Sequence, residues 1–181
     1  MMQSVTIICD GSSRLIDRKR MAGAAAVLIS GNLETSSSLD TASNKIPRKF
    51  KLVAAALGEA TNQQAEINAV ILGLKQLKVP CRVKVLTDSR YVIETMKGNF
   101  SKRANLDLWK ELEKTASRHQ IKWEWIKGHS SESSESYQLQ KLADRVASQV
   151  AEKQDFPLDF KNKIEEKIRE VLLLSENSRT K

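Results

Sequence analysis

Cysteine and histidine are scarce in this sequence, with two of each among 181 residues. Cys9 and Cys81 fall in or beside predicted strands and lack the spacing of metal ligands, so we expect reduced core thiols in an intracellular protein. Also missing are a charged leader followed by an apolar stretch, an apolar run of membrane length and an internal repeat. We therefore expect a cytoplasmic protein that does not span a membrane.

Positive charge exceeds negative charge in the chain. It has 30 Lys and Arg against 22 Asp and Glu, a net charge of +8 and a pI of 9.5. This balance favours a polyanionic partner, because neutralisation of phosphates dominates the affinity of proteins for nucleic acids. Charge alone decides little, since many basic proteins bind no polyanion. At 181 residues the chain has the length of one domain with a real core.

Hydrophobic periodicity predicts an α/β protein in which an N-terminal run of strands precedes alternating helices and strands. The predicted strands cover 4–9, 22–29, about 50–57, 82–87 and 121–126, and the predicted helices cover 62–77, 90–97, 106–119 and 138–153. A segment rich in Ser and Thr, 35–44, is the predicted loop between the second and third strands. This order is typical of a mixed sheet with helices on both faces.

Two of the predicted strands stop at an aspartate. The apolar, β-branched run that begins at Val5 stops at Asp10, and the run that begins at Val83 stops at Asp88. Taken alone, either aspartate could simply open a turn. In an α/β sheet, however, ligands collect outside the carboxyl ends of parallel strands. Neighbouring strand tips would therefore direct both carboxylates into one crevice.

Two further carboxylates lie beside the apolar rows of predicted helices. Glu66 follows a capping box formed by Thr61 and Gln64, so the cap does not require it. Its alternative role is a favourable interaction with the helix dipole. Asp144 borders the apolar stripe of the helix at 138–153. A carboxylate on a buried helix face is costly unless it is paired or bound to metal, so both residues need an explanation.

The residues Asp10, Glu66, Asp88 and Asp144 would repel one another if the fold gathers them. Like charges at close range stay ionised together only with counter-ions, so a shared site predicts a divalent metal. Of the two histidines, His129 lies in a polar loop and is expected to be the freer one to titrate. A metal-dependent nuclease is the first hypothesis to test.

Five short motifs, taken in order, resemble type 1 ribonuclease H. They are Asp-Gly-Ser at 10–12, Thr-Asn-x-x-x-Glu at 61–66, Thr-Asp-Ser at 87–89, Trp-x-Trp-Ile-Lys-Gly-His at 123–129 and Ala-Asp-x-x-Ala at 143–147. Each motif alone is weak, but the ordered set is specific and the resemblance covers residues 4–153. It implies a ribonuclease H-like fold, with a mixed five-stranded sheet and helices on both faces.

The resemblance implies an endoribonuclease that hydrolyses the RNA strand of RNA/DNA hybrids and leaves 5′-phosphate and 3′-hydroxyl ends. Asp10, Glu66, Asp88 and Asp144 would hold two Mg²⁺ ions roughly 4 Å apart, one to activate a water and one to stabilise the leaving oxygen. Mn²⁺ is an expected substitute, because it also accepts oxygen ligands. His129 would assist proton movement or product release.

The resemblance also suggests the residues that bind substrate. Asn62, Gln63 and Arg90 would contact the minor groove of the hybrid, where the 2′-hydroxyl distinguishes RNA from DNA. Ser13 and Thr61 would lie near the phosphates of the DNA strand. Asn62 could instead serve only as a helix cap, and Arg90 as a solvated helix start. Arg90 also departs from the amide that the family usually carries at its position.

The sequence departs from the family at two places that would bind the duplex. A basic stretch, 14–20, replaces a glycine-rich one, and the short segment 97–105 stands where some cellular members have a long basic handle. We therefore expect Arg18, Lys19 and Arg20 to grip the duplex.

Residues 1–153 make up the expected catalytic domain, and residues 154–181 a linker, an amphipathic helix and a polar tail. The helix has apolar residues at helical spacing from Ile164 to Leu172. It could pack back on the domain, or it could mediate self-association or docking. We expect a monomer.

Two other functions are kept open. A 3′–5′ exonuclease of the same superfold also uses four carboxylates, but it needs Asp-x-Glu on the first strand, where this chain has Asp-Gly-Ser at 10–12. A hybrid-binding module without catalysis is the non-enzymatic alternative, against which the complete set of four carboxylates argues.

Overall fold

The structure, a computed structural model, describes residues 2–31, 48–126 and 134–177. In chain order its elements are β1 (Gln3–Ile16), β2 (Lys19–Ser30), β3 (Phe50–Glu59), α1 (Asn62–Leu74), β4 (Cys81–Thr87), α2 (Arg90–Met96), α3 (Leu106–Ala116), β5 (Gln120–Trp125), α4 (Glu135–Lys153) and α5 (Leu158–Asn177). The strands form one sheet in the order β3-β2-β1-β4-β5. The β1–β2 and β2–β3 pairs are antiparallel, whereas β1–β4 and β4–β5 are parallel. The predicted mixed five-stranded sheet is therefore confirmed.

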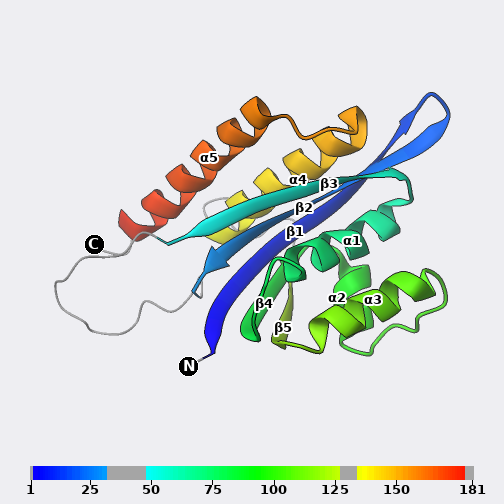
Figure 1. Cartoon of the computed structure of the whole chain (residues 1–181), viewed down its shortest axis with the longest axis horizontal. Coiled ribbons are helices and arrows are strands. Elements are labelled where there is room, and N and C mark those ends of the chain that lie inside the picture. Colours follow the sequence, from blue (N-terminus) through cyan, green and yellow to red (C-terminus); the bar gives the residue numbers. More distant parts are fainter. Residues whose placement is uncertain (1, 32–47, 127–133, 178–181) are drawn as a thin grey trace.

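Helices cover both faces of the sheet, with α4 and α5 on one side and α1, α2 and α3 on the other (Figure 1). The core under α1, α2 and α3 includes Ile7, Ile67 and Trp109. The core under α4 and α5 includes Ile8 and Val146. Ile7 and Ile8 belong to different cores because successive side chains of a strand point to opposite faces. The central strand β1 is therefore buried on both sides.

Strand β1 is longer than the sequence predicted. The predicted strand stops at Cys9, but β1 runs to Ile16 and pairs with β2 along that whole extension. The turn that follows contains Asp17 and Arg18, both with positive φ, which is the conformation of a tight two-residue hairpin. Asp10 therefore lies inside a strand, and the prediction that it ends one is wrong. The strand continues because the polar Gly-Ser-Ser run after Asp10 still has β2 as a hydrogen-bonding partner.

The capping box predicted at the start of α1 is confirmed. The Thr61 hydroxyl accepts a hydrogen bond from the Gln64 N–H at 3.2 Å, and the Gln64 side chain accepts one from the Thr61 N–H at 2.8 Å. Helix α4 begins at Glu135, three residues before the predicted start at 138. The reason is a second cap, since the Ser134 hydroxyl accepts a hydrogen bond from the Tyr137 N–H at 3.3 Å.

Helix α5 packs back against α4 (Figure 1). Its apolar row, which includes Ile164, Ile168 and Leu172, is buried in the same core as α4 and the sheet. Of the two roles considered for this segment, packing on the domain is the one that the structure shows. Among the described residues, no helix has both the length and the apolar character needed to cross a bilayer. The predicted loop at 35–44 lies outside the described residues.

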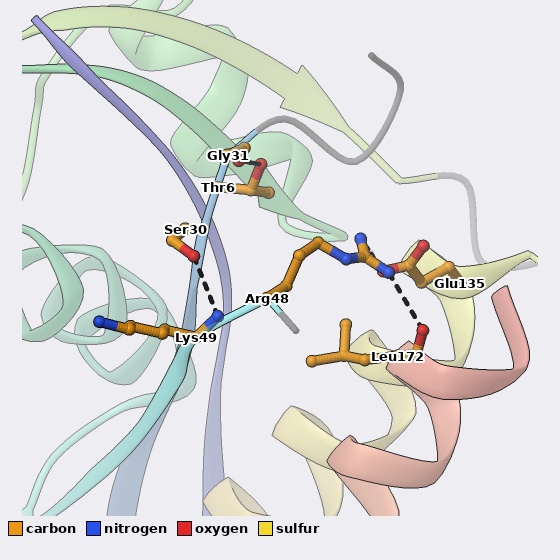
Figure 2. A network of polar contacts seen from close by, with 7 residues as sticks. All are labelled: Thr6, Ser30, Gly31, Arg48, Lys49, Glu135 and Leu172. Carbon is orange, nitrogen blue, oxygen red and sulfur yellow. Dashed lines mark hydrogen bonds and ion pairs between the residues drawn. The ribbon is translucent and has the colours of Figure 1, made fainter. Parts of the chain in front are cut away.

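A half-buried arginine joins the start of α4 to the C-terminal half of α5. The Arg48 guanidinium forms an ion pair with Glu135 at 2.6 Å and donates a hydrogen bond to the Leu172 carbonyl at 3.3 Å (Figure 2). The two charged side chains are only 16% and 7% exposed, so the pair is shielded from water. Nearby, the Lys49 N–H donates to the Ser30 hydroxyl at 3.0 Å. These contacts attach the chain before β3 to both helices on this face.

Candidate active site

The end of the parallel pairing between β1 and β4 brings two aspartates together. The last paired residues are Ile8 and Leu86, and Asp10 and Asp88 each follow two residues later. Asp10 is only 7% exposed, and one of its carboxylate oxygens accepts a hydrogen bond from the Gly11 N–H at 2.8 Å. The sequence argument expected both carboxylates at strand tips facing one crevice. Asp10 instead lies within β1, but its carboxylate is close enough to Asp88 for the two charges to interact.

Helix α1 brings Glu66 to the same place because Gly11 has no side chain. A Cβ added to Gly11 would lie 2.1 Å from the backbone carbon of Ala65 and 2.2 Å from the nitrogen of Glu66. The two Glu66 carboxylate oxygens accept hydrogen bonds from the Asn62 amide at 3.0 Å and the Ser89 hydroxyl at 2.6 Å. Glu66 is therefore held from its own helix and from the turn after β4.

Helix α4 approaches from the opposite face and supplies Asp144. Its close approach depends on Gly23, where an added Cβ would lie 2.5 Å from the Ala151 nitrogen. The Ser148 hydroxyl, one turn after Asp144, lies 3.4 Å from its carboxylate and 3.1 Å from the Ser12 hydroxyl of β1. Through Ser148 and Ser12, Asp144 is therefore connected to the strand that carries Asp10.

Gln140 connects α4 to both strand ends. Its amide nitrogen lies 3.4 Å from the Asp88 carboxylate and 3.4 Å from the Cys9 carbonyl. The side chain is 5% exposed, and its amide oxygen has no hydrogen-bond partner among the described residues. Sequence reasoning assigned Gln140 no role. The signal was present, because Gln140 lies four residues before Asp144 and so on the same face of α4.

Burial and the charges of neighbouring carboxylates raise the pKa values of Asp10, Glu66 and Asp88. Burial is the main cause that raises the pKa of Asp10 to about 8; the charges of Asp88, Asp144 and Glu66 add to it, and the Gly11 N–H opposes it. Burial also raises the pKa of Glu66, which the charge of Asp88 raises further. The pKa of Asp88 is raised by burial and by Asp144. The structure thus brings the four carboxylates within one another's electric field.

We call Asp10, Glu66, Asp88 and Asp144 the carboxylate cluster. No Lys or Arg of the described residues forms an ion pair with any of its members. In the described ranges, no three acidic, His or Cys side chains are placed so that they already form a metal-binding group. The chemistry of the set fits a hard divalent cation, which takes oxygen ligands and would offset the repulsion.

The residues predicted to bind substrate form two groups. Ser13 and Asn62 are joined, because the Ser13 N–H donates to the Asn62 side-chain oxygen at 3.1 Å. Arg20 extends this group, with a guanidinium nitrogen 3.4 Å from the Ser13 hydroxyl. Thr61 is the cap of α1, and Gln63 is exposed on its first turn.

The second group consists of residues without a described contact to the first. Arg18 and Lys19 are exposed at the turn of the β1–β2 hairpin. Arg90, the first residue of α2, has its guanidinium 5.4 Å from the centre of the Trp125 ring. His129 lies outside the described residues, so its role stays a prediction.

Comparison with known proteins gives one family. The family model described as RNase H matches residues 2–152. A "Ribonuclease H" of Helicobacter pylori (strain HPAG1) is 35% identical over 137 residues, which are 71% of this chain and 83% of the relative. A "Ribonuclease H" of Moorella thermoacetica is 33% identical over 170 residues, which are 86% of this chain and 99% of the relative.

Solved structures agree on the fold. LC9-RNase H1 matches with a TM-score of 0.65 at 20% identity, covering 86% of this chain and 75% of its own. The N-terminal RNase H domain of a Mycobacterium tuberculosis protein, solved as a fusion with maltose-binding protein, matches with a TM-score of 0.61 at 27% identity, covering 83% of this chain and 94% of its own. Since the family model extends from β1 to α4 and named relatives align along most of their length, the chain belongs to the RNase H family.

Proposed function

We propose that this chain is a ribonuclease H that hydrolyses the RNA strand of RNA/DNA hybrids at internal positions, leaving 5′-phosphate and 3′-hydroxyl ends. Its relatives with 33% to 35% identity are named Ribonuclease H. LC11-RNase H1, which has the same fold, was solved in complex with an RNA/DNA hybrid. The observation that supports the activity best is the carboxylate cluster, in which burial and the charges of neighbouring members raise the pKa values of Asp10, Glu66 and Asp88. No Lys or Arg in the described part of the chain forms an ion pair with the cluster.

The RNase H family generally uses divalent metal. We propose that the carboxylate cluster holds two Mg²⁺ ions, with Mn²⁺ as a substitute. Bound there, the ions would supply an activated water and stabilise the leaving 3′ oxygen of the RNA phosphodiester. The chain's own residues would keep the ligands in place: Asn62 and Ser89 hold Glu66, Gln140 holds Asp88, and Ser148 holds Asp144.

The proposed substrate contacts follow the two groups of residues at the site. Thr61, Asn62 and Gln63 lie at the start of α1 before Glu66, Ser13 donates to Asn62, and Arg90 follows Asp88 by two residues, so these five residues border the carboxylate cluster. Arg18, Lys19 and Arg20 would bind phosphates farther along the duplex, because their charges sit at the exposed end of the β1–β2 hairpin. His129 would assist proton movement or product release.

The proposed catalytic unit is residues 1–153, followed by a linker and the helix α5 in residues 154–181. Support comes from the family model, which ends at residue 152. We propose a monomer, because the apolar row of α5 is already buried against its own chain.

The decisive experiment is cleavage of an RNA/DNA hybrid whose RNA strand carries an end label, with Mg²⁺ or with EDTA. Internal cuts of the RNA that require metal are expected. Trimming of either strand from its end would instead support a 3′–5′ exonuclease, and binding without cleavage would support a non-catalytic module. The matched control is Asp10→Asn, which keeps the shape of the side chain and removes its charge. This variant should bind the hybrid at least as tightly as the wild type and leave the RNA intact.

A further inference from the structure

Trp125 contacts the segment that carries Asp88 in two different ways. It is the last residue of β5 and pairs with Thr87, the last residue of β4. Its indole N–H donates a hydrogen bond to the Asp88 carbonyl at 2.9 Å. The face of the same indole lies under the Arg90 guanidinium, 5.4 Å from the ring centre. The Trp125 side chain therefore contacts Asp88 and Arg90, the two residues that flank Ser89.

The segment from Asp88 to Arg90 takes part in the site at every position. Asp88 belongs to the carboxylate cluster, and Ser89 both caps α2 and donates to Glu66 at 2.6 Å. Main-chain bonds hold the carbonyls on either side of Asp88: the Ile126 N–H donates to the Thr87 carbonyl at 2.9 Å, and the Ile93 N–H donates to the Ser89 carbonyl at 3.2 Å. The indole N–H is the contact that holds the Asp88 carbonyl. The N–H of the same peptide, from Ser89, donates to the Thr87 hydroxyl at 3.1 Å. Loss of the indole contact would therefore release the carbonyl side of the peptide next to the Asp88 carboxylate.

Arg90 is exposed, and its guanidinium forms no hydrogen bond or ion pair within the described ranges. Stacking on the ring uses one face of the guanidinium and leaves the N–H groups along its edge available. Arginine only donates hydrogen bonds, so its partner must be an acceptor. A hybrid duplex offers two kinds next to the cleaved strand, phosphate oxygens and the minor-groove acceptors of the bases.

We infer that Trp125 is a positioning residue that couples the two parts of the site: its N–H fixes the Asp88 main chain for metal binding, and its ring fixes Arg90 as a hydrogen-bond donor to acceptors of the hybrid. The inference rests on the proposed function. It assigns a role to a residue outside the carboxylate cluster and outside the predicted substrate contacts. It also explains how an arginine can serve where the family usually has an amide, because the ring holds the longer side chain in one orientation.

Two substitutions separate the two contacts. Trp125→Phe keeps an aromatic ring under Arg90 and removes the N–H, whereas Trp125→Leu removes both. Trp125→Phe should lower kcat and weaken Mg²⁺ binding about three- to tenfold, the usual effect of losing one hydrogen bond, with the KM for the hybrid little changed. Mg²⁺ binding is measured without substrate, from the rise of Tm with Mg²⁺ concentration. Trp125→Leu should weaken Mg²⁺ binding equally and raise KM as well.

Arg90→Gln should raise KM and leave the Mg²⁺ dependence of Tm unchanged. If the acceptor is a phosphate oxygen, the slope of log K for hybrid binding against log salt concentration should fall in magnitude by about 0.9. If the acceptor is on a base, this slope should be unchanged. Arg82→Gln is the matched charge control, since Arg82 is exposed at the opposite end of β4. In the Arg90→Gln background, Trp125→Leu should raise KM no further than Trp125→Phe does.

Hybrid affinity is also measured by anisotropy in the Asp10→Asn background, so that cleavage does not interfere. Additive effects of Arg90→Gln and Trp125→Leu would overturn the coupling to Arg90. If Trp125→Phe keeps the kcat and the Mg²⁺ affinity of the wild type, the coupling to Asp88 is overturned. Failure of the proposed function looks different, because then the wild type itself would make no internal cuts in the RNA strand of the hybrid. Far-UV spectra and unfolding curves establish that Trp125→Phe is folded, and this variant carries the test if Trp125→Leu is not.

Discussion

The backbone nitrogen of Glu66 lies 2.2 Å from the position that a Cβ on Gly11 would occupy. Strand β1 and helix α1 are thus in direct backbone contact one residue away from Asp10. The separation between Asp10 and Glu66 is set by this contact, and no side chain acts as a spacer. Gly23 provides the same kind of contact between β2 and α4 on the other face, where an added Cβ would lie 2.6 Å from the Ala147 carbonyl oxygen.

Gly11→Ala should abolish or nearly abolish cleavage, because the added methyl group must push α1, and Glu66 with it, away from Asp10. Overpacking of this kind also costs about 1–3 kcal/mol of unfolding free energy. The matched control is Gly73→Ala, farther along α1, where the added Cβ would meet the Ile7 side chain at 2.7 Å. It should lower stability and keep kcat. Equal loss of kcat in both variants would show that instability, and not the position of Glu66, causes the loss.

Stability without divalent metal should fall as pH rises from about 4 to about 8. The pKa of Asp10 is raised from 3.8 to about 8 in the folded chain, so between these values the folded state binds a proton that the unfolded state has released. Deprotonation therefore favours unfolding across this window. In EDTA, Asp10→Asn should be more stable than the wild type at pH 8 and about equally stable at pH 4.

Denaturant unfolding at several pH values measures this difference, and saturating Mg²⁺ should reduce it in the wild type by offsetting the charge. The prediction is contradicted if the difference in unfolding free energy between the wild type and Asp10→Asn is the same at pH 5 and at pH 8.

Changing Arg18, Lys19 and Arg20 together to Ala should raise KM and leave kcat little altered. Phosphate contacts remote from the carboxylate cluster bind substrate and transition state equally, so their loss is a loss of uniform binding. The salt slope should fall by about 0.9 for each lost phosphate contact on a B-form duplex.

The control for the hairpin removes the same net charge elsewhere, at the exposed residues Arg82, Lys163 and Lys167. If the control variant and the hairpin variant give the same KM and salt slope, net charge explains the effect and the grip lies elsewhere.

Arg48→Met should destabilise the fold strongly, by about 3–5 kcal/mol, because it removes the positive charge 2.6 Å from the Glu135 carboxylate, whose side chain is only 7% exposed. The double variant Arg48→Met, Glu135→Leu should recover most of that loss, since replacing both charges leaves none uncompensated. Unfolding curves of the two single variants and the double variant give the coupling energy of the pair. Independent, additive losses would mean that the ion pair is not what holds this corner together.

The sequence was sufficient for the order of the strands and helices, because that depends on local patterns, whereas the grouping of the four carboxylates was expected from the resemblance to a family. Asp88 was predictable from a short apolar strand, and Glu66 from its place after a cap that does not need it. The length of β1 was not predictable, because Gly-Ser-Ser after Asp10 is a common turn sequence and only the pairing with β2 keeps it extended. His129 stays a prediction.

Contacts between distant segments were also beyond the sequence. Trp125 meets Asp88 and Arg90 only because β5 pairs with β4 in the register that sets Thr87 beside Trp125. The amphipathic pattern of α5 predicted a helix, but a hydrophobic stripe does not state which surface it covers. The structure shows that α5 covers the core that it shares with α4. Arg48, more than a hundred residues earlier in the chain, donates a hydrogen bond to the Leu172 carbonyl of α5.

The placement of α4 and α5 also has a consequence for synthesis of the protein. A ribosome releases Asp10, Glu66 and Asp88 first, and Asp144 only with α4. The core that seats α4 is completed later still, by Ile164 and Ile168 of α5. The carboxylate cluster is therefore incomplete until α4 has emerged, and α4 gains the rest of its packing from α5 afterwards. Because the proposed metal site needs all four carboxylates, we expect no cleavage by a nascent chain that ends before α4.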